Sequence, residues 1–344
     1  MNNIKCINQN ALLHNLKFCQ SFDKKIMAMV KADAYGHGMK NIVKILNNKV
    51  AFWGVANADE ALKLRRILPK GCVLVVGKTK QFKPLIKNNI DITIDTLQEL
   101  KEIENICKQH NINANIHIAI NTGMNRIGVK NICIFKQMLS CIYTSQHIKL
   151  KGIFTHCFDE DCIKSHFKQQ MIKFKQFVNC VKDKDILVHI GGSFCLTKQI
   201  PEFINMVRVG YFLYGYGAPN LKPVMQIYSK VIKITHCNKG EFVGYGKTLL
   251  KRYKEIALLS IGYADGVPLA LSNKGYVTIN NQRCKIIGKI CMDVMMVDVS
   301  EKNVKPYDNA KIFDNAKYFA NITKTSPYEI LTNFSKIRGV AKII

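Results

Sequence analysis

Short apolar segments alternate with amphipathic segments over the first two-thirds of the chain. The apolar segments are rich in β-branched and aliphatic residues and have the length of strands that are buried on both faces. There are eight of them, at residues 26–30, 52–56, 73–76, 92–94, 114–120, 148–155, 186–190 and 206–209.

The gaps between these segments carry helical spacing. Apolar residues recur every three or four positions at Leu97, Leu100, Ile103 and Ile106, and again at Ile163, Phe167, Met171, Phe174 and Val178. Strands that alternate with helices indicate right-handed βαβ units and a parallel sheet. Eight such units in the first 220 residues favour a closed (β/α)8 TIM-like barrel, with an open doubly wound sheet as the structural alternative.

The pattern changes after a stretch at residues 215–223 that is rich in glycine and proline. From Val224 onward apolar and polar residues alternate, and turn signals recur at short intervals, as at 238–240, 264–266 and 280–281. We therefore expect an α/β chain with two domains, a barrel over residues 1–220 and a mainly β domain over residues 221–344.

The charge is strongly positive, but it is not gathered in one place. The chain has 51 Lys and Arg against 24 Asp and Glu, a formal net charge of +27, and its lysines are scattered among the expected helices, turns and strand ends. A nucleic-acid surface more often concentrates its charge in a stripe with arginines and aromatic residues. Nonspecific adhesion to polyanions is the simpler consequence of this charge.

Cysteine use and hydropathy indicate the compartment. The 13 cysteines include no C-x-x-C pair, residues 1–10 carry no apolar signal core, and no segment approaches the roughly 18 consecutive apolar residues of a membrane span. We expect reduced thiols in a soluble, cytoplasmic protein that interacts with neither a membrane nor a nucleic acid.

Polar residues follow several of the expected barrel strands, at the ends where barrel enzymes carry their active sites. They are Lys31, Arg126, His156, His189, Ser193 and Arg208. Each alone is more often structural, but together they surround one mouth, and two of them belong to the seven arginines of the chain. Glycines at 191–192 and 210 suit a phosphate, and a desolvated lysine is a nucleophile, so the pattern suggests a phosphorylated carbonyl compound held as an imine.

Six ordered motifs make this idea specific. They are VKADAYGHG at 30–38, NTGMNRIG at 121–128, MVRVG at 206–210, VGYG at 243–246, IGYADG at 261–266 and ICMD at 290–293. In this order they resemble the alanine racemases, enzymes that use pyridoxal phosphate, and the resemblance covers nearly the whole chain.

The resemblance implies roles for the cofactor residues. Lys31 would carry pyridoxal phosphate as a Schiff base and then act as one base of the reaction, and Arg208 would donate to the pyridine nitrogen. Because arginine stays charged, it would keep that nitrogen unprotonated, which weakens the ring as an electron sink and limits side reactions such as transamination. The phosphate would be held by Tyr35, Ser193, Gly210 and Tyr211. His189 would pack beside Arg208 or serve as a buried structural histidine.

The resemblance also implies a homodimer with shared active sites. Tyr245 of the second subunit, assisted by His156, would be the base on the opposite face of the α-carbon, and neighbouring cations would have to lower its pKa from about 10. The substrate would contact Arg126, Tyr263 and Met292. The implied activity is the interconversion of L-alanine and D-alanine, which supplies D-alanine for peptidoglycan.

Some positions depart from the family pattern. Ala119 stands where most members carry a lysine, often carbamylated, that faces the equivalent of Arg126. Asn121, Phe154 and Gly192 stand where Asp, Tyr and Asn are common, and the tail at 337–340 only approximates the family's R-V-P-R-x-Y ending. We expect activity to survive these changes, with altered cofactor affinity or substrate preference.

Other functions are compatible with parts of the pattern. A racemase of serine or lysine would share the fold, and a pyridoxal-phosphate decarboxylase would keep Lys31 without needing Tyr245. A cofactor carrier without turnover would be indifferent to the loss of Tyr245. A nucleic-acid-binding protein would show steeply salt-dependent binding and would not need Lys31.

Overall fold

The chain folds into two compact units. The computed structural model describes residues 3–158, 164–197 and 199–344. One unit, here the barrel unit, comprises residues 13–32 and 43–221, and the other, here the β unit, comprises residues 1–12, 33–42 and 222–344. Residues 1–12 and 33–42, which the hydrophobic pattern placed in a barrel over 1–220, thus belong to the unit formed mainly by residues 222–344.

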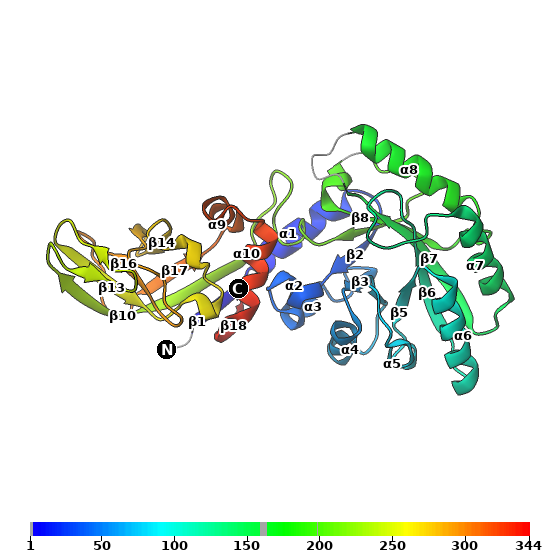
Figure 1. Ribbon diagram of the computed structural model, residues 1–344, viewed down its shortest axis with the longest axis horizontal. Helices are drawn as coiled ribbons and strands as arrows, with labels where there is room; N and C mark the ends of the chain where they lie inside the picture. Colours follow the sequence, from blue (N-terminus) through cyan, green and yellow to red (C-terminus); the bar gives the residue numbers. More distant parts are fainter. Residues whose placement is uncertain (1–2, 159–163, 198) are drawn as a thin grey trace. The chain divides into compact units, whose positions relative to one another are not determined.

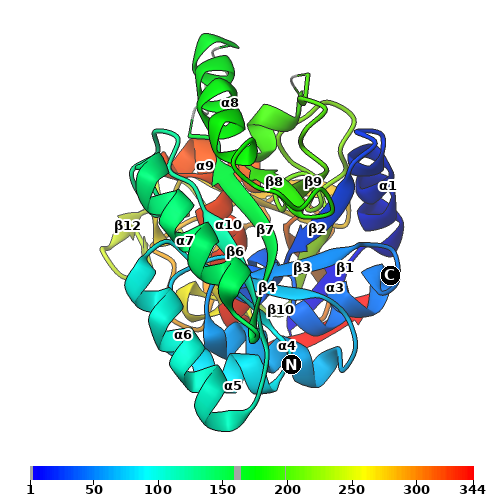
Figure 2. The same ribbon diagram turned by 90° about the vertical axis from the view of Figure 1, so that its right-hand side faces the viewer.

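The barrel unit is a closed barrel of eight parallel strands (Figures 1 and 2). The strands are β2 (Lys25–Met29), β3 (Phe52–Val55), β4 (Val73–Val75), β5 (Asp91–Ile94), β6 (Ala114–Ala119), β7 (Ile148–His156), β8 (Leu187–Gly191) and β9 (Met206–Val209). All residues of β3, β4, β5, β8 and β9 are buried, because the helices cover the outside and side chains fill the interior. The prediction of a TIM-like barrel is confirmed.

Helices follow the strands along the chain and lie outside them (Figure 2). They are α3 (Met39–Leu46), α4 (Ala58–Ile67), α5 (Phe82–Lys87), α6 (Leu97–His110), α7 (Ile132–Thr144) and α8 (Lys164–Val178), with α1 (Gln9–Gln20) ahead of the first barrel strand. Side chains of Asn57, Thr96 and Asn131 cap α4, α6 and α7 by accepting bonds from first-turn N–H groups. Ile163, part of the predicted α8 pattern, lies outside the described residues.

The β unit is built on a sheet in which the order is β15-β14-β17-β10-β1-β18, and β13 joins β10 to β16. Its strands are β1 (Asn3–Ile7), β10 (Met225–Cys237), β11 (Phe242–Val243), β12 (Thr248–Leu249), β13 (Lys254–Leu259), β14 (Tyr276–Ile279), β15 (Gln282–Lys285), β16 (Met295–Asp298), β17 (Asn309–Phe313) and β18 (Gly339–Ile343). Two short helices, α9 (Ala316–Thr323) and α10 (Pro327–Asn333), complete it. The prediction of a mainly β domain is confirmed.

Strand β1 explains why the units interleave along the chain. It pairs antiparallel with β10 and parallel with β18, so the start of the chain is held in the sheet of the β unit. Among the described residues, no helix is both long and apolar enough to cross a membrane.

Candidate active site

Arg208 lies near the C-terminal end of β9 and is buried. Its Nη1–H group donates to Nδ1 of His189 at 2.8 Å. Its Nη2 donates to the carbonyl oxygen of Thr155 at 2.8 Å and to Nδ1 of His156 at 3.2 Å. Burial lowers the pKa of the Arg208 guanidinium to about 9, which leaves it charged at neutral pH.

A relay of hydrogen bonds continues from Arg208 into the barrel. His189 accepts from Arg208 at Nδ1, so its hydrogen is on Nε2, which donates to Nδ1 of His117 at 2.9 Å. His117 then carries its hydrogen on Nε2 and donates to the Asp91 carboxylate at 3.2 Å. Burial and the Arg208 charge hold the pKa of His189 well below its usual range, so this imidazole stays a neutral acceptor. Every donor in the relay points away from Arg208.

An aromatic ring and a glycine also surround the Arg208 guanidinium. The guanidinium carbon lies 4.5 Å from the ring centroid of Phe154, which stacks on His189 at 4.8 Å. Gly191 is directly opposite Arg208 in the strand pairing, and a Cβ atom there would lie 2.6 Å from Nη2. Only glycine leaves the guanidinium this room.

Lys31 follows β2 and is electrostatically coupled to this group. Burial lowers the pKa of the Lys31 amine, and the charges of Arg126 and Arg208 lower it as well, while Glu60 acts in the opposite direction. The Glu60 carboxylate also accepts the backbone N–H groups of Ala32 at 2.7 Å and Ala56 at 2.8 Å. A lysine whose ammonium form is disfavoured is a ready nucleophile and proton acceptor.

His156, at the end of β7, is also neutral. Burial lowers its pKa to about 2, helped by the charges of Arg208, Arg126 and Lys31. Nδ1 of His156 therefore accepts from Arg208 at neutral pH and carries no proton.

The chain makes a left-handed turn directly after Lys31. The turn, α2 (Lys31–Tyr35), has φ between +50 and +57 at four consecutive non-glycine residues, Ala32 to Tyr35. Left-handed helical conformation costs about 1–2 kcal/mol per residue, so other contacts must hold it.

Residues of the β unit supply those contacts at the end of the turn. The buried Lys5 amine donates to the carbonyl oxygen of Gly36 at 2.7 Å, and Nδ1–H of His37 donates to the carbonyl oxygens of Ala34 and Tyr35, each at 3.0 Å. Gly36 has φ +80, and a Cβ atom there would lie 2.1 Å from the Leu331 carbonyl oxygen. The turn is thus fixed by its surroundings rather than by its own preference.

Two further loops of the barrel unit are suited to a phosphate. Gly192, with φ +111, leads from β8 into a 3-10 turn that begins with the buried Ser193. Gly210 follows β9, and the buried Tyr211 after it stacks on Tyr216 at 5.4 Å. These loops offer a hydroxyl group and glycine backbone at the same end of the barrel as Arg208.

Arg126 is in the loop after β6 and is exposed. No carboxylate among the described residues lies within ion-pair distance of it. Ala119, at the end of β6, is buried and offers no polar group.

The other predicted site residues belong to the β unit. Tyr245 lies between β11 and β12 with 72% of its surface exposed, and Tyr263 and Met292 are also exposed. The loops that carry the last two are joined, because the N–H group of Tyr263 donates to the carbonyl oxygen of Cys291, and that of Ala264 to Met292.

Arg338 ties these two loops together. Its guanidinium makes two bonds to the buried carboxylate of Asp265, each 2.9 Å, and a third to Asp293 at 2.7 Å. Arg338 holds the pKa of the Asp265 carboxyl below its usual value despite burial. The sequence motifs gave no sign of this role.

The motifs and the two-unit fold agree with known protein families. Residues 7–218 match the family described as alanine racemase, N-terminal domain, and residues 224–340 match alanine racemase, C-terminal domain. The chain belongs to the alanine racemase family.

Individual alanine racemases are similar over nearly their full length. That of Borreliella burgdorferi strain ZS7 is 35% identical, over 96% of this chain and 94% of that protein. The structure of alanine racemase from Clostridium difficile 630 has a TM-score of 0.93 at 29% identity, covering 100% of this chain and 96% of that one. Alanine racemase from Bartonella henselae, described with covalently bound pyridoxal phosphate, has a TM-score of 0.87 at 25% identity and covers 100% of both chains.

The residues of the barrel unit fit the cofactor of this alanine racemase family. Lys31 is an amine that burial disposes to react with an aldehyde. Among the described residues, the Nε–H group of Arg208 and one of the two Nη1–H groups have no acceptor, so Arg208 keeps a donor for a ring nitrogen. The loops at Ser193 and Gly210 provide for a phosphate.

Sequence reasoning missed part of the site. His117 and Asp91 extend the relay from Arg208, and Glu60 fixes the turn after Lys31. The available signal for the first two was a polar side chain inside an otherwise apolar strand, which is costly unless the side chain has a buried partner.

Proposed function

We propose that this protein interconverts L-alanine and D-alanine with pyridoxal phosphate, using Lys31 and Tyr245 as the two groups that transfer protons. Membership of the alanine racemase family supports the activity. The mechanism rests on the hydrogen bonds of Arg208. This charged donor binds neutral acceptors, and the chain of hydrogen bonds through His189 and His117 ends at the Asp91 carboxylate.

The barrel residues would hold the cofactor by complementary chemistry. Lys31 would bind its aldehyde carbon, and Arg208 would donate Nε–H to its pyridine nitrogen. Ser193, Gly210 and Tyr211 would hold the phosphate, joined by Tyr35. When bound to an amino acid, pyridoxal phosphate makes the α-hydrogen acidic. Arg208 limits this effect, because a charged donor leaves the ring nitrogen without a proton and favours prompt return of the proton to carbon.

Racemisation needs a proton acceptor and a proton donor on opposite faces of the α-carbon. Lys31, with its lowered pKa, would serve one face. We assign the other face to Tyr245 of a second subunit in a homodimer, assisted by His156. The exposure of Tyr245, Tyr263 and Met292 in the single chain supports an assignment in which a partner covers them.

Arg126 would bind the substrate carboxylate through a bidentate pair of hydrogen bonds, and the substrate would also contact Tyr263 and Met292. In this proposal the D-alanine serves peptidoglycan synthesis in the cytoplasm. The 13 cysteines without a C-x-x-C pair agree with a reducing compartment.

Chiral product analysis tests the activity. Purified protein with pyridoxal phosphate is incubated with L-alanine, and with L-serine and L-lysine as competitors. D-alanine should form fastest, and the reaction in deuterated water should exchange the α-hydrogen in both directions. Absence of any D-isomer from a protein that has bound the cofactor would exclude the racemase function and leave decarboxylation or cofactor storage.

Three variants test the assignment of the two bases. Lys31→Ala should abolish covalent attachment of the cofactor, and Tyr245→Phe should retain the cofactor but lose turnover. Tyr307→Phe is the control, because Tyr307 is an exposed tyrosine of the same unit, with 66% of its surface accessible, and has no assigned role. Equal turnover by Tyr245→Phe and the parent protein would contradict the two-base mechanism.

A further inference from the structure

We propose that Asp95, oriented by Lys78, positions the loop that carries Arg126 and thereby sets the affinity of the enzyme for the substrate carboxylate. This inference rests on the proposed function, in which Arg126 binds that carboxylate. It adds two residues that follow β5 and β4 and that no motif of the family resemblance includes.

The loop that carries Arg126 is held through residues other than Arg126 itself. Arg126 is exposed, and no carboxylate of the described chain reaches it. Hydrogen bonds of its neighbours hold the loop. The N–H group of Asn121 donates to the carbonyl oxygen of Val129 at 3.0 Å, that of Val129 donates to Ala119 at 2.9 Å, and the side-chain oxygen of Asn121 accepts from the N–H groups of Gly123 and Asn125 at 3.0 and 3.2 Å. The position of Arg126 therefore depends on how its neighbours in the chain are held.

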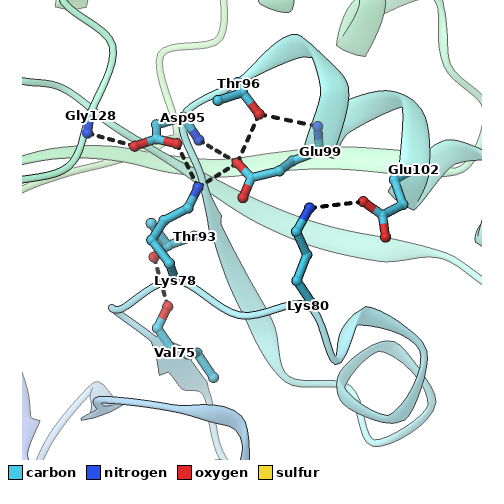
Figure 3. Close-up of polar contacts among 9 residues, drawn as sticks. All are labelled: Val75, Lys78, Lys80, Thr93, Asp95, Thr96, Glu99, Glu102 and Gly128. Atoms are coloured by element: carbon cyan, nitrogen blue, oxygen red, sulfur yellow. Dashed lines mark hydrogen bonds and ion pairs between the residues drawn. The ribbon is translucent and has the colours of Figure 1, made fainter.

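Gly128, two residues after Arg126, is the tightest point of the loop. Its φ is +112, and a Cβ atom there would lie 2.6 Å from the backbone nitrogen of Asn121. Its N–H group donates to Oδ2 of Asp95 at 2.7 Å. This bond joins the Arg126 loop to the segment that follows β5 (Figure 3).

The carboxylate of Asp95 is itself held in place. Its Oδ1 accepts from the Lys78 amine at 2.5 Å, and the same amine also binds Glu99. The Asp95 N–H group donates to Glu99 at 3.2 Å, so backbone and side chain are both fixed. Figure 3 shows Lys78 between the two carboxylates and Gly128 on the far side of Asp95.

Burial distinguishes this cluster from an ordinary surface pair. The side chains of Asp95 and Glu99 are 14% and 6% exposed. The neighbouring pair, Lys80 and Glu102, has a longer N–O distance of 3.3 Å and exposures of 69% and 41%. Solvent screens the outer pair more than the inner cluster, in which the two carboxylates are mostly buried and Lys78 is 34% exposed.

The same cluster connects three successive loops of the barrel. Lys78 comes from the loop after β4, Asp95 from the loop after β5, and Gly128 from the loop after β6. A shift of Asp95 would be transmitted to Gly128 through a single charge-assisted bond and from there along two residues to Arg126. Asp95 is therefore a positioning residue and does not itself touch the substrate.

The test compares Asp95→Ala, Asp95→Asn and Lys78→Met with the matched control Lys80→Met. Two quantities are measured on the cofactor-loaded enzyme: the split of the alanine kinetics into KM and kcat, and the equilibrium binding of propionate, which is alanine without its amine. Asp95→Ala should raise KM and the propionate Kd about tenfold with a smaller change in kcat, because it removes a bond to a charged acceptor. Asp95→Asn, which keeps an acceptor for Gly128, should recover much of the affinity, and Lys78→Met should lie between the two.

Three outcomes would overturn the inference: an unchanged propionate Kd in Asp95→Ala, an equal effect of Lys80→Met, or a loss of kcat and bound cofactor with no change in KM. The last pattern would identify Asp95 as a merely structural residue. If Asp95→Ala fails to fold, Asp95→Asn and Lys78→Met carry the same comparison. If the parent enzyme does not racemise alanine, the proposed function fails, but the propionate measurement still decides whether Asp95 controls the carboxylate site.

Discussion

Replacing Gly191 by alanine adds one methyl group beside the Arg208 guanidinium. Gly191 lies opposite Arg208 in the strand pairing, and its φ is not in the left-handed region, so alanine meets no backbone strain there. The added Cβ atom would lie 2.6 Å from Nη2, 2.8 Å from Nε and 2.9 Å from the guanidinium carbon. Because ordinary contact begins near 3.4 Å, the guanidinium must move by about 0.8 Å.

A movement of that size breaks hydrogen bonds. Nη2 donates at 2.8 Å to the carbonyl of Thr155 and at 3.2 Å to His156, and a shift of about 0.8 Å lengthens at least one of these bonds beyond useful range. A hydrogen bond to a charged group contributes about 1.5–3 kcal/mol, so losing one corresponds to about thirtyfold in an equilibrium constant. The same shift carries Nε–H away from the ring nitrogen, and the bond lost there is also a hydrogen bond from a charged group, so we expect the Kd of pyridoxal phosphate to rise by this factor.

The assay is equilibrium titration of the apoprotein with pyridoxal phosphate, followed by the absorption of the bound cofactor. Gly54→Ala is the matched control, since Gly54 is a buried barrel glycine whose added Cβ atom would meet the flexible ends of two methionines, Met29 and Met27. Gly54→Ala should bind the cofactor nearly as well as the parent protein. If Gly191→Ala also binds it with unchanged affinity and absorption, Arg208 is not held as described.

Two further predictions concern the β unit. Burial lowers the pKa of His37 to about 3 from 6.5, so between these pH values the unfolded chain binds more protons than the folded protein. The free energy of unfolding should therefore fall as the pH drops below about 6.5, by about 2 kcal/mol between pH 7 and pH 5. Urea denaturation of His37→Asn should show a shallower pH dependence. Arg338→Met should lower kcat/KM while the cofactor Kd stays unchanged, because the loops of Tyr263 and Met292 lose their tie through Asp265; an equal loss of cofactor affinity would contradict this division of labour.

The barrel could be predicted because its strands are nearly uniform apolar runs. Burial on both faces leaves no polar alternation, so each run stands out, as at Val73–Val75 and Met206–Val209. Strand β1 was not predicted, because Asn3–Ile7 contains a buried Lys5 and a buried Asn3 that resemble surface residues in the sequence. Its partners lie at the other end of the chain, where local patterns carry no information.

The sequence predicted which ionisable residues form the site, but not the hydrogen bonds and turns that hold them in place. Lys31 and Arg208 are recognisable because ionisable residues at strand ends suit catalysis. The left-handed turn after Lys31 has no compositional signal, since its residues are neither glycine nor asparagine and its conformation comes from tertiary contacts. Tyr245 is known only from the family resemblance, because an exposed tyrosine in one chain acquires meaning only with a second chain.

The pairing of β1 with β18 has a consequence for the order of events during synthesis. The ribosome makes Asn3–Ile7 before the barrel strands, but the strands that enclose it, β10 and β18, are made only after the entire barrel. The barrel can therefore fold during translation, while the sheet of the β unit must close after Gly339–Ile343 has emerged. Lys5 lies on β1 and donates a hydrogen bond to the carbonyl oxygen of Gly36. The turn that follows Lys31 is therefore fully held only after β1 has paired. A nascent chain thus completes its barrel before it completes its cofactor site. An extension that disturbs β18 would loosen the turn that follows Lys31.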